Sequence, residues 1–390
     1  RVLPPSTSGQ AVMIHRLLRG LQPDNYCLIS VQNYAVPSDR NEYSGRLSGR
    51  YYHLFPQFQL TRGHRFGLNQ WRSRINVLLS MPGIVWRGSQ IARILRRENC
   101  DAVVACTGDL LDLPAAYLAS RLVGIPFYPY IFDYYSYQWT EPTTRYLAQR
   151  LERILLSKAA GVIVPNEFLR DELSVRYGVE ATVIHNPCEI AEYEAISNDP
   201  PTKDGDEIRI VYTGAIYAAH YDAFRNLLTA IELLGRSDLK LHLYTDFSRR
   251  DLEENGIRGP VVFHEYQVAS AIPAIQRQAN LLFLPLAFNS PYPEVIKTSA
   301  PGKMGEYLAA RRPILVHAPS NSFVAWYFRH HECGLVVDRT DPEQLVWAIE
   351  QVLTDASLRQ RLSIRAWERA QSDYSIAVAQ ATFAQLMKLT

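Results

Sequence analysis

Short apolar runs alternate with longer amphipathic stretches along most of the 390-residue chain. In the first half, the runs that predict strands lie at 26–31, 101–106, 126–131, 160–164 and 181–185. In the second half, they lie at 208–213, 240–245, 260–264, 281–286, 313–317 and 334–338. These runs show little polar alternation, which is typical of strands that are buried on both faces of a parallel sheet.

The stretches between the runs predict helices. They lie at 111–123, 142–158, 166–177, 222–235, 269–279, 302–311, 322–331 and 342–354. Alternating strands and helices predict an α/β fold with doubly wound sheets. Residues 191–207 are polar and contain a Pro-Pro pair, so we expect them to be a linker. The sequence therefore predicts two tandem Rossmann-like domains, 1–190 and 208–373, that face a cleft where a ligand would bind.

The composition narrows the class of protein. Hydrophobic residues make up 47% of the chain and charged residues 21%, as in soluble globular proteins. The five cysteines show no paired spacing, which argues against a disulfide scaffold and favours a reducing compartment. No apolar run reaches the roughly 18 residues that span a bilayer, and no signal peptide is visible. We expect a cytoplasmic protein whose natural N-terminus lies upstream of Arg1, since the sequence does not begin with Met.

Charge is unevenly distributed along the chain. Residues 46–97 contain ten arginines and no lysine, aspartate or glutamate, although the whole chain carries only +2. Within them, a helix over 70–81 would present Trp71, Ile75, Leu78 and Leu79 on one apolar face. This pattern fits a helix that lies on an anionic membrane at the inner face, or one docked on the first sheet with solvated arginines. We do not expect nucleic acid as a partner, because the segment matches no known binding module.

A loop and helix in the second half carry candidate chemistry. Residues 298–316 read TSAPGKMGEYLAARRPILV and follow a buried strand. Pro301 suits the first turn of a helix, because the N–H that it lacks would be unpaired there. Thr298 or Ser299 would cap this helix. Unpaired N–H groups at a helix start bind phosphate, so we expect an anion at this point.

Neighbouring side chains extend this site. Gly302 would let a ligand approach the backbone closely, and Lys297 and Lys303 add positive charge. Glu306 would lie about 7 Å along the helix axis from Pro301. That is roughly the offset between the diphosphate and the ribose of a nucleotide, and a carboxylate accepts two hydroxyl donors well. Alternatively, Glu306 would only complement the helix dipole and Lys303 would be a solvated surface lysine.

The stretch resembles the donor-binding segment of family-4-type retaining glycosyltransferases of the GT-B fold. The matching residues are Ser299, Pro301-Gly302-Lys303, Glu306-Tyr307-Leu308-Ala309-Ala310 and Pro313-Ile314-Leu315. Residues 3–21, 183–189 and 334–362 are similar to further segments of that family, in the same order. By analogy, a last helix within 374–390 would return to the first domain and complete it.

The resemblance implies transfer of a sugar, with retention, from a nucleotide-diphosphate sugar to a glycan or lipid-linked acceptor. Neither a metal nor any cofactor other than this co-substrate is expected. Glu306 would bind the ribose, and Lys303, Lys297 and Ser299 would hold the diphosphate. Gly214 would allow close approach of the donor, and Tyr266 would stack on the base. Gly214 and Tyr266 also have structural alternatives, a turn glycine and a core tyrosine.

The sequence departs from the family pattern at two places. Thr298 stands where many members carry an acid aimed at the sugar. The loop that begins at Gly214, GAIYAAHYDAF, lacks the usual Arg and Lys, for which Lys297 and Lys303 would have to substitute. These departures leave the donor sugar open. Three alternative functions therefore stay open: a non-catalytic nucleotide-sugar-binding partner, a sugar-nucleotide epimerase and a phosphorylase.

The first domain supplies the candidates on the acceptor side. Asp133 occupies a place where members often carry a basic residue and an aspartate that face the cleft, so it is our catalytic candidate. Gly9 and His15 belong to the opening loop and first helix. A strand-end cap and a structural histidine are the alternatives. HHEC at 330–333 and Asp-Gly-Asp at 204–206 contain metal-ligand residue types, but we assign no metal to either.

Overall fold

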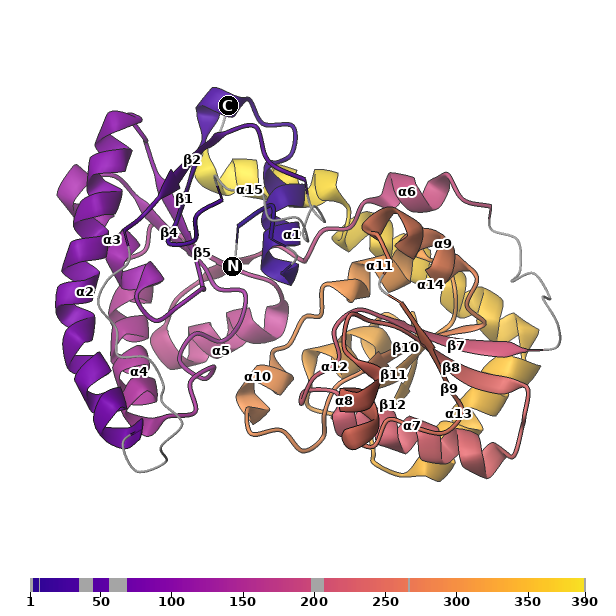
Figure 1. Ribbon diagram of the computed structural model, residues 1–390. Helices are drawn as coiled ribbons and strands as arrows, with labels where there is room; N and C mark the ends of the chain where they lie inside the picture. Colours follow the sequence, from indigo (N-terminus) through magenta and orange to yellow (C-terminus); the bar gives the residue numbers. More distant parts are fainter. Residues whose placement is uncertain are drawn as a thin grey trace. The chain divides into compact units, whose positions relative to one another are not determined.

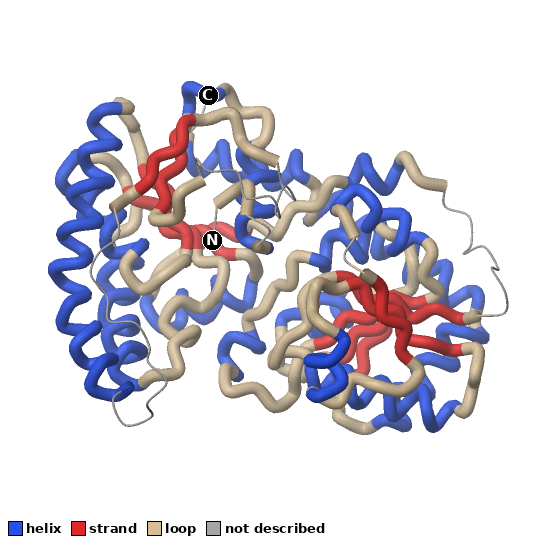
Figure 2. The backbone as a smooth tube through the Cα atoms, viewed as in Figure 1, coloured by secondary structure: helices blue, strands red, loops and turns tan. Residues whose placement is uncertain are grey.

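The computed structural model describes residues 3–6, 8–34, 45–55, 69–197, 207–265 and 267–388. The chain divides into two compact units. The first unit comprises Arg1–His185 and Gln380–Thr390, and the second comprises Asn186–Ala379. In each unit, strands are surrounded by helices (Figure 1 and Figure 2). All the described strand pairs are parallel, which confirms the predicted α/β fold class.

The first unit is built on a four-stranded sheet in which consecutive strands are neighbours. Its strands are β3 (Val103–Cys106), β4 (Phe127–Tyr130), β5 (Val162–Val164) and β6 (Ala181–Val183). Its helices are α1 (Gly9–Leu18), η1 (Pro23–Asn25), α2 (Asn69–Arg97), α3 (Asp112–Val123), α4 (Pro142–Ser157) and α5 (Glu167–Tyr177). The carboxyl ends of β3 and β4 are joined where the amide of Phe132 donates to the Thr107 hydroxyl (3.1 Å).

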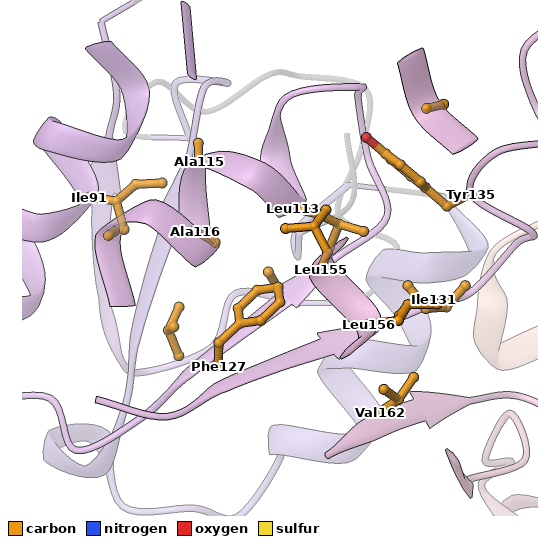
Figure 3. Close-up of a cluster of buried hydrophobic side chains, with 14 of the residues drawn as sticks. Ile91, Leu113, Ala115, Ala116, Phe127, Ile131, Tyr135, Leu155, Leu156 and Val162 are labelled. Atoms are coloured by element: carbon orange, nitrogen blue, oxygen red, sulfur yellow. The ribbon is translucent and has the colours of Figure 1, made fainter. Parts of the chain in front are cut away.

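The core of the first unit lies between this sheet and its helices. Phe127, Leu155 and Val162 belong to one buried cluster, which Figure 3 shows. Helix α2 contributes Ile91 to the same cluster. A β-carbon at Gly88 would lie 3.0 Å from the carbonyl oxygen of Ala115, so only glycine lets α2 pack this closely on α3.

Two further strands pair separately in the first unit. They are β1 (Cys27–Ser30) and β2 (Arg50–His53). We did not predict β2, because its sequence RYYH is polar and its ends are exposed. A cavity of about 1800 Å³ is lined by residues of β1, β3, α1 and the C-terminal segment 382–388. It contains none of the predicted donor-binding residues.

The second unit has a six-stranded sheet in the order β12-β11-β10-β7-β8-β9. The strands are β7 (Ile208–Thr213), β8 (Leu239–Tyr244), β9 (Val261–His264), β10 (Leu281–Pro285), β11 (Ile314–His317) and β12 (Leu335–Val337). The chain builds outward from β7 to β9, then returns to β10 and builds in the opposite direction. The sheet therefore has a topological switch point between the carboxyl ends of β7 and β10, where such sheets bind ligands.

Helices cover this second sheet. They are α6 (Ile190–Glu194), α7 (Tyr221–Leu234), α8 (Arg249–Glu254), η3 (Ala269–Ala271), α9 (Ile272–Arg277), α10 (Pro293–Lys297), α11 (Lys303–Ala309), α12 (Phe323–His330), α13 (Pro342–Thr354) and α14 (Ala356–Asp373). Helix α6 occupies part of the expected linker. The last helix, α15 (Ile376–Met387), contains the position where the chain passes from the second unit to the first. At this position the side-chain amide of Gln380 donates to carbonyl oxygens at the C-terminal end of α1, including that of Arg19 (2.7 Å).

One buried carboxylate holds part of the first unit together. Glu152, on α4, accepts hydrogen bonds from the Ser136 hydroxyl (2.6 Å), the Tyr177 hydroxyl (2.6 Å) and the Ser136 amide (3.3 Å). Burial raises the pKa of this carboxyl. Three donors therefore depend on a single acceptor group.

We expect Glu152→Leu to lower the free energy of unfolding by about 3 kcal/mol, because it leaves two buried donors of Ser136 and the partly buried Tyr177 hydroxyl unpaired. Glu152→Gln keeps the shape and one acceptor oxygen and should cost less. Urea denaturation measures both effects. Glu350→Leu, at an exposed position of α13, is the matched control. An equal change in the Glu152→Leu and Glu350→Leu proteins would show that the network does not stabilise the unit.

Candidate functional site

The loop after β7 begins with an exposed glycine at the switch point. Gly214 has φ +115°, a conformation that residues with a β-carbon rarely adopt. Its amide donates to the carbonyl oxygen of Tyr244 at the end of β8 (2.9 Å). The backbone here is therefore fixed, and it carries no side chain that would keep a ligand away from it.

Lys303 lies beside this glycine. A β-carbon at Gly214 would be 3.4 Å from the lysine Nζ. The Nζ donates to the hydroxyl oxygen of Tyr212 (2.5 Å), and this hydroxyl donates to the carbonyl oxygen of Ala215 (2.6 Å). Tyr212 thus holds both the lysine and the loop. The structure places the two predicted residues, Gly214 and Lys303, next to each other.

The charge of Lys303 is sensitive to its surroundings. Burial lowers the pKa of the ammonium group to about 7, and the negative charge of Glu306 opposes this shift. A bound anion would raise this pKa, because it stabilises the charged form.

Helix α11 presents Lys303 and Glu306 on one side. The other residues Met304, Gly305, Tyr307, Leu308 and Ala309 are buried. Residues three apart on a helix are neighbours, so Lys303 and Glu306 share the partly exposed strip of this short helix, although the ammonium group itself turns inward to Tyr212. Glu306 is tolerated in this largely buried helix because it lies on the side of α11 that the core does not cover.

Buried hydrogen bonds position α11 on the sheet. The amide of Thr213 donates to the Tyr307 hydroxyl (3.1 Å), and the Gln276 side-chain amide donates to the Thr213 hydroxyl (3.0 Å). The side-chain amide of Asn186 donates to the carbonyl oxygen of Ala300 in the preceding loop (2.8 Å). A β-carbon at Gly305 would lie 3.0 Å from Cys188, so the helix cannot move closer on that side.

The predicted capping of this helix is wrong. Helix α11 begins at Lys303, and its N-cap is Gly302, without a side-chain cap. Thr298 instead ends α10, where its hydroxyl donates to the Glu294 carbonyl oxygen (3.0 Å). The reason is that residues 293–297 form a helix of their own, which takes Thr298 into its last turn.

The remaining candidates of the second unit are found around this point. Lys297 is the last residue of α10, and Ser299 follows in the connecting loop. Both are partly exposed. Tyr266, the candidate for base stacking, lies outside the described residues, as does the Asp-Gly-Asp sequence at 204–206.

The sequence reasoning missed a histidine in the loop after β7. His220 is 4% exposed, and its ring lies 4.5 Å from that of Tyr217. Within the described residues, its Nδ1 atom has no hydrogen-bond partner. Burial and the charge of Lys303 hold the pKa of His220 well below its usual range. The sequence feature that could have indicated His220 is that it is the one basic side chain in the loop between Gly214 and Arg225, which contains no Arg or Lys.

This loop is also anchored to the loop after β10. Asp222 accepts hydrogen bonds from the amides of Phe288 (3.0 Å) and Asn289 (2.8 Å). The amide of Ala287 donates to the carbonyl oxygen of Ala219 (2.7 Å). The two sides of the switch point are therefore bonded to each other.

In the first unit, the predicted acceptor-side residues lie near the carboxyl ends of the strands. The side-chain amide of Gln10 donates to exposed Asp133, which follows β4 (3.3 Å). Gly9 is the first residue of α1, and a β-carbon there would meet nothing within 4 Å. His15 lies on the same helix, where burial and neighbouring arginines lower its pKa. The structure thus connects Asp133 to the start of α1.

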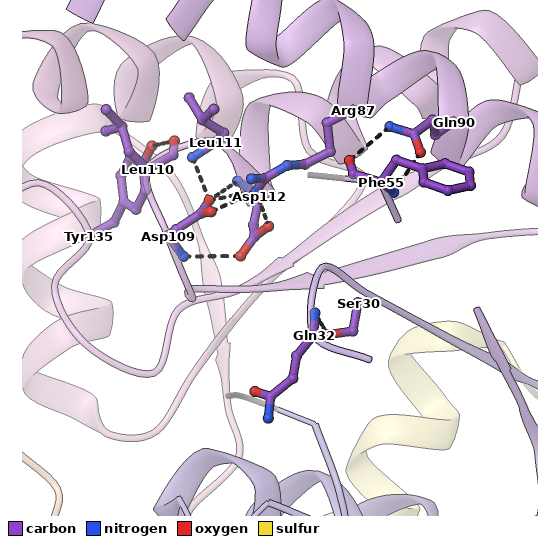
Figure 4. A network of polar contacts seen from close by, with 10 residues as sticks. All are labelled: Ser30, Gln32, Phe55, Arg87, Gln90, Asp109, Leu110, Leu111, Asp112 and Tyr135. Atoms are coloured by element: carbon purple, nitrogen blue, oxygen red, sulfur yellow. Dashed lines mark hydrogen bonds and ion pairs between the residues drawn. The ribbon is translucent and has the colours of Figure 1, made fainter. Parts of the chain in front are cut away.

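A cluster of two aspartates and one arginine, which was not predicted, also lies in the first unit. Arg87 donates to Asp109 (2.7 Å) and to Asp112 (2.5 Å), as Figure 4 shows. Burial and the charge of Asp109 raise the pKa of Asp112 to about 6. Arg87 is 3% exposed, so the expectation that the arginines of 46–97 are solvated is wrong for this one.

Two structural features bear on metals and membranes. Within the described ranges, no three His, Cys, Asp or Glu side chains gather as a metal ion would require. In the HHEC sequence, His330 stacks on Trp326 at 5.1 Å and Cys333 is buried. None of the helices in the described part of the chain is both long and apolar enough to cross a membrane.

Comparison with known proteins gives matches over most of the chain. A family described as Glycosyltransferase Family 4 matches residues 7–192, and one described as Glycosyl transferases group 1 matches residues 207–355. The alpha-D-kanosaminyltransferase of Streptomyces kanamyceticus is 25% identical over 307 residues, covering 73% of this chain and 76% of the relative.

Two solved structures share the fold along almost the whole chain. One is a glycosyltransferase from Rickettsia africae ESF-5, with a TM-score of 0.67 and 13% identity, covering 98% of this chain and 96% of that one. The other is Anabaena Alr3699/HepE in complex with UDP and glucose, also with a TM-score of 0.67 and 13% identity. It covers 99% of this chain and 97% of the Anabaena chain.

Proposed function

Because the chain belongs to the family-4-type glycosyltransferases of the GT-B fold, we propose that it transfers a sugar with retention to a glycan or lipid-linked acceptor. It is a glycosyltransferase with a nucleotide-sugar donor. What we propose is the retention of anomeric configuration and the type of acceptor. We propose that the reaction needs no metal, since Lys303 can stabilise the leaving diphosphate. Its proposed location is cytoplasmic, peripheral on the inner membrane face.

The observation that carries the proposal is the placement of Lys303 against Gly214. A diphosphate bound at the switch point would meet an ammonium group and an open backbone together. Negative charge grows on the leaving diphosphate during glycosyl transfer, and a fixed cation stabilises that transition state. Lys297 and the Ser299 hydroxyl would add contacts from the neighbouring loop.

Glu306 would then orient the nucleotide. It lies on the same side of α11 as Lys303, three residues and so about 4.5 Å further along the helix axis. Its carboxylate can accept hydrogen bonds from both ribose hydroxyls. UDP-sugars are the first donors to test, because the Anabaena structure contains UDP and glucose.

His220 would assist at the diphosphate. Its Nδ1 is buried and unpaired within the described residues, and it lies in the loop that begins at Gly214. A neutral imidazole can donate one hydrogen bond to a phosphate oxygen without adding charge beside Lys303. Thr298 is neutral and faces the end of α10, so the sugar would be recognised by other groups.

We expect the affinity for nucleoside diphosphates to fall as the pH rises above about 7. The free Lys303 loses its proton above its pKa of about 7. Since the diphosphate binds the protonated form, affinity should drop by about tenfold per pH unit until the pKa of the complex is reached. Calorimetric titrations at several pH values measure this slope.

The matched variant is Lys303→Arg, because a guanidinium keeps its proton across this range. The affinity that the Lys303→Arg protein retains for nucleoside diphosphates should not change with pH above 7 in this way. The same pH dependence in both proteins would mean that a group other than Lys303 causes it.

The function itself is tested by donor turnover. Incubation with UDP-, GDP- and dTDP-sugars should release the nucleoside diphosphate from one of them through many turnovers. Binding without any release, even with acceptor mixtures added, would instead indicate a non-catalytic nucleotide-sugar-binding protein.

A further inference from the structure

Helix α2 carries a strip of exposed apolar side chains. Its members are Ile75, Leu78, Met81, Pro82, Val85 and Trp86, which we call the α2 outer face. They recur every three or four residues, so they share one side of the helix. Leu78 is 75% exposed and Trp86 49%, although both are among the most apolar side-chain types. The strip is about 17 Å long at 1.5 Å per residue.

The fold of the first unit does not require these side chains. The opposite side of α2 supplies the core contacts, through Ile84, Ile91 and Leu95. Arg87 also points inward, to Asp109 and Asp112 (Figure 4). Exposed apolar residues scattered singly are ordinary, but a continuous strip on one helix marks an interaction surface.

The charge of the helix indicates the kind of partner. Helix α2 contains six arginines and no lysine, aspartate or glutamate in 29 residues. Arg93, Arg96 and Arg97 are exposed beyond the apolar strip. Arg97 also pairs with Glu98, which follows the helix (3.7 Å), but no acidic residue lies on the helix itself. An apolar strip continued by cations on such a helix is complementary to a surface of apolar chains and negative headgroups. A protein partner would need an acidic rim of matching shape to fit the same pattern.

We propose that the α2 outer face binds the surface of a bilayer that contains anionic lipid. Leu78, Met81 and Trp86 enter the boundary between headgroups and acyl chains, while the arginines contact the headgroups. This inference rests on the proposed function where it concerns the acceptor, because a lipid-linked acceptor would be met at that surface. The binding itself is independent of catalysis, since no donor-site residue takes part.

Vesicle flotation of the whole protein tests the proposal. One set of vesicles would contain phosphatidylcholine alone, and the other would contain equal amounts of phosphatidylcholine and phosphatidylglycerol. The protein should float with the anionic vesicles, less so at high salt, and weakly with the neutral ones. The double variant Leu78→Asp with Trp86→Asp should partition at least about tenfold less, because it buries less apolar area and adds repulsion.

A matched control separates the face from general effects of charge. Val175→Asp with Trp347→Asp adds the same charge at exposed apolar positions of α5 and α13, and should float like the wild type. Nucleoside diphosphate titration of each variant checks that the second unit is intact. Nucleotide binding without vesicle binding overturns this inference alone. Vesicle binding without any donor binding contradicts the proposed function instead.

Two other results would also overturn the inference. One is equal flotation of the wild type and the Leu78→Asp/Trp86→Asp protein. The other is a dimer that this double variant dissociates while neither protein binds vesicles. The dimer would identify a second copy of the chain as the partner of the α2 outer face, and analytical ultracentrifugation would detect it.

Discussion

Replacement of Lys303 by methionine is expected to weaken the binding of nucleoside diphosphates by about a hundredfold, or about 2.7 kcal/mol. Methionine keeps the length and apolar stem of the side chain but removes the ammonium group. That group is fixed between Tyr212 and Gly214, so no neighbouring lysine can simply replace it. Inorganic pyrophosphate should lose affinity as well, because the contact is with phosphate.

Calorimetry at pH 7 measures this effect. Lys158→Met, at an exposed position of the first unit, is the control for loss of one positive charge. A change of less than about threefold would show that other groups hold the diphosphate, since that ratio is below 1 kcal/mol. An unchanged melting temperature would show that the loss does not come from unfolding.

Replacement of Glu306 by alanine should have the second largest effect and weaken the binding of ribonucleoside diphosphates by about thirtyfold. The carboxylate would make two charge-assisted hydrogen bonds to the ribose, and each is worth roughly 1–2 kcal/mol. Affinity for inorganic pyrophosphate should change much less, because pyrophosphate has no ribose and Glu306 affects its binding only through the Lys303 pKa. This contrast distinguishes Glu306 from Lys303.

The control for this second effect is Glu294→Ala, which removes the other carboxylate of the same segment, on α10. It should leave nucleotide affinity near that of the wild type. If Glu306→Ala weakened pyrophosphate and nucleotide equally, the ribose assignment would be wrong, and Glu306 would act by holding the helix or the lysine.

Most of the sheets could be predicted from the sequence because their strands are buried on both faces. The run at 208–213 coincides with β7, and the helix at 342–354 coincides with α13. Strand β2 was missed since Arg50 and His53 are exposed at its ends. The helix expected at 70–81 continues to Arg97, because the apolar residues of its inner face extend that far.

The candidate site could be predicted only where its residues lie close together in the sequence. Lys303 and Glu306 share one helix, and a local motif identifies both. The Tyr212 contact to Lys303 joins residues 91 positions apart, and no local pattern indicates it. The wrong cap at Thr298 has a related cause, since helix α10 competes for the same residue.

The central claim is that this second unit holds a nucleotide sugar and that the protein turns it over. The most direct measurement is time-resolved proton NMR of a UDP-, GDP- or dTDP-sugar incubated with the purified protein and acceptor glycans or lipid-linked sugars. We expect steady release of one nucleoside diphosphate, a product with the donor's anomeric configuration, and loss of both signals in the Lys303→Met protein. Absence of release from every donor, or an inverted product, would contradict the account.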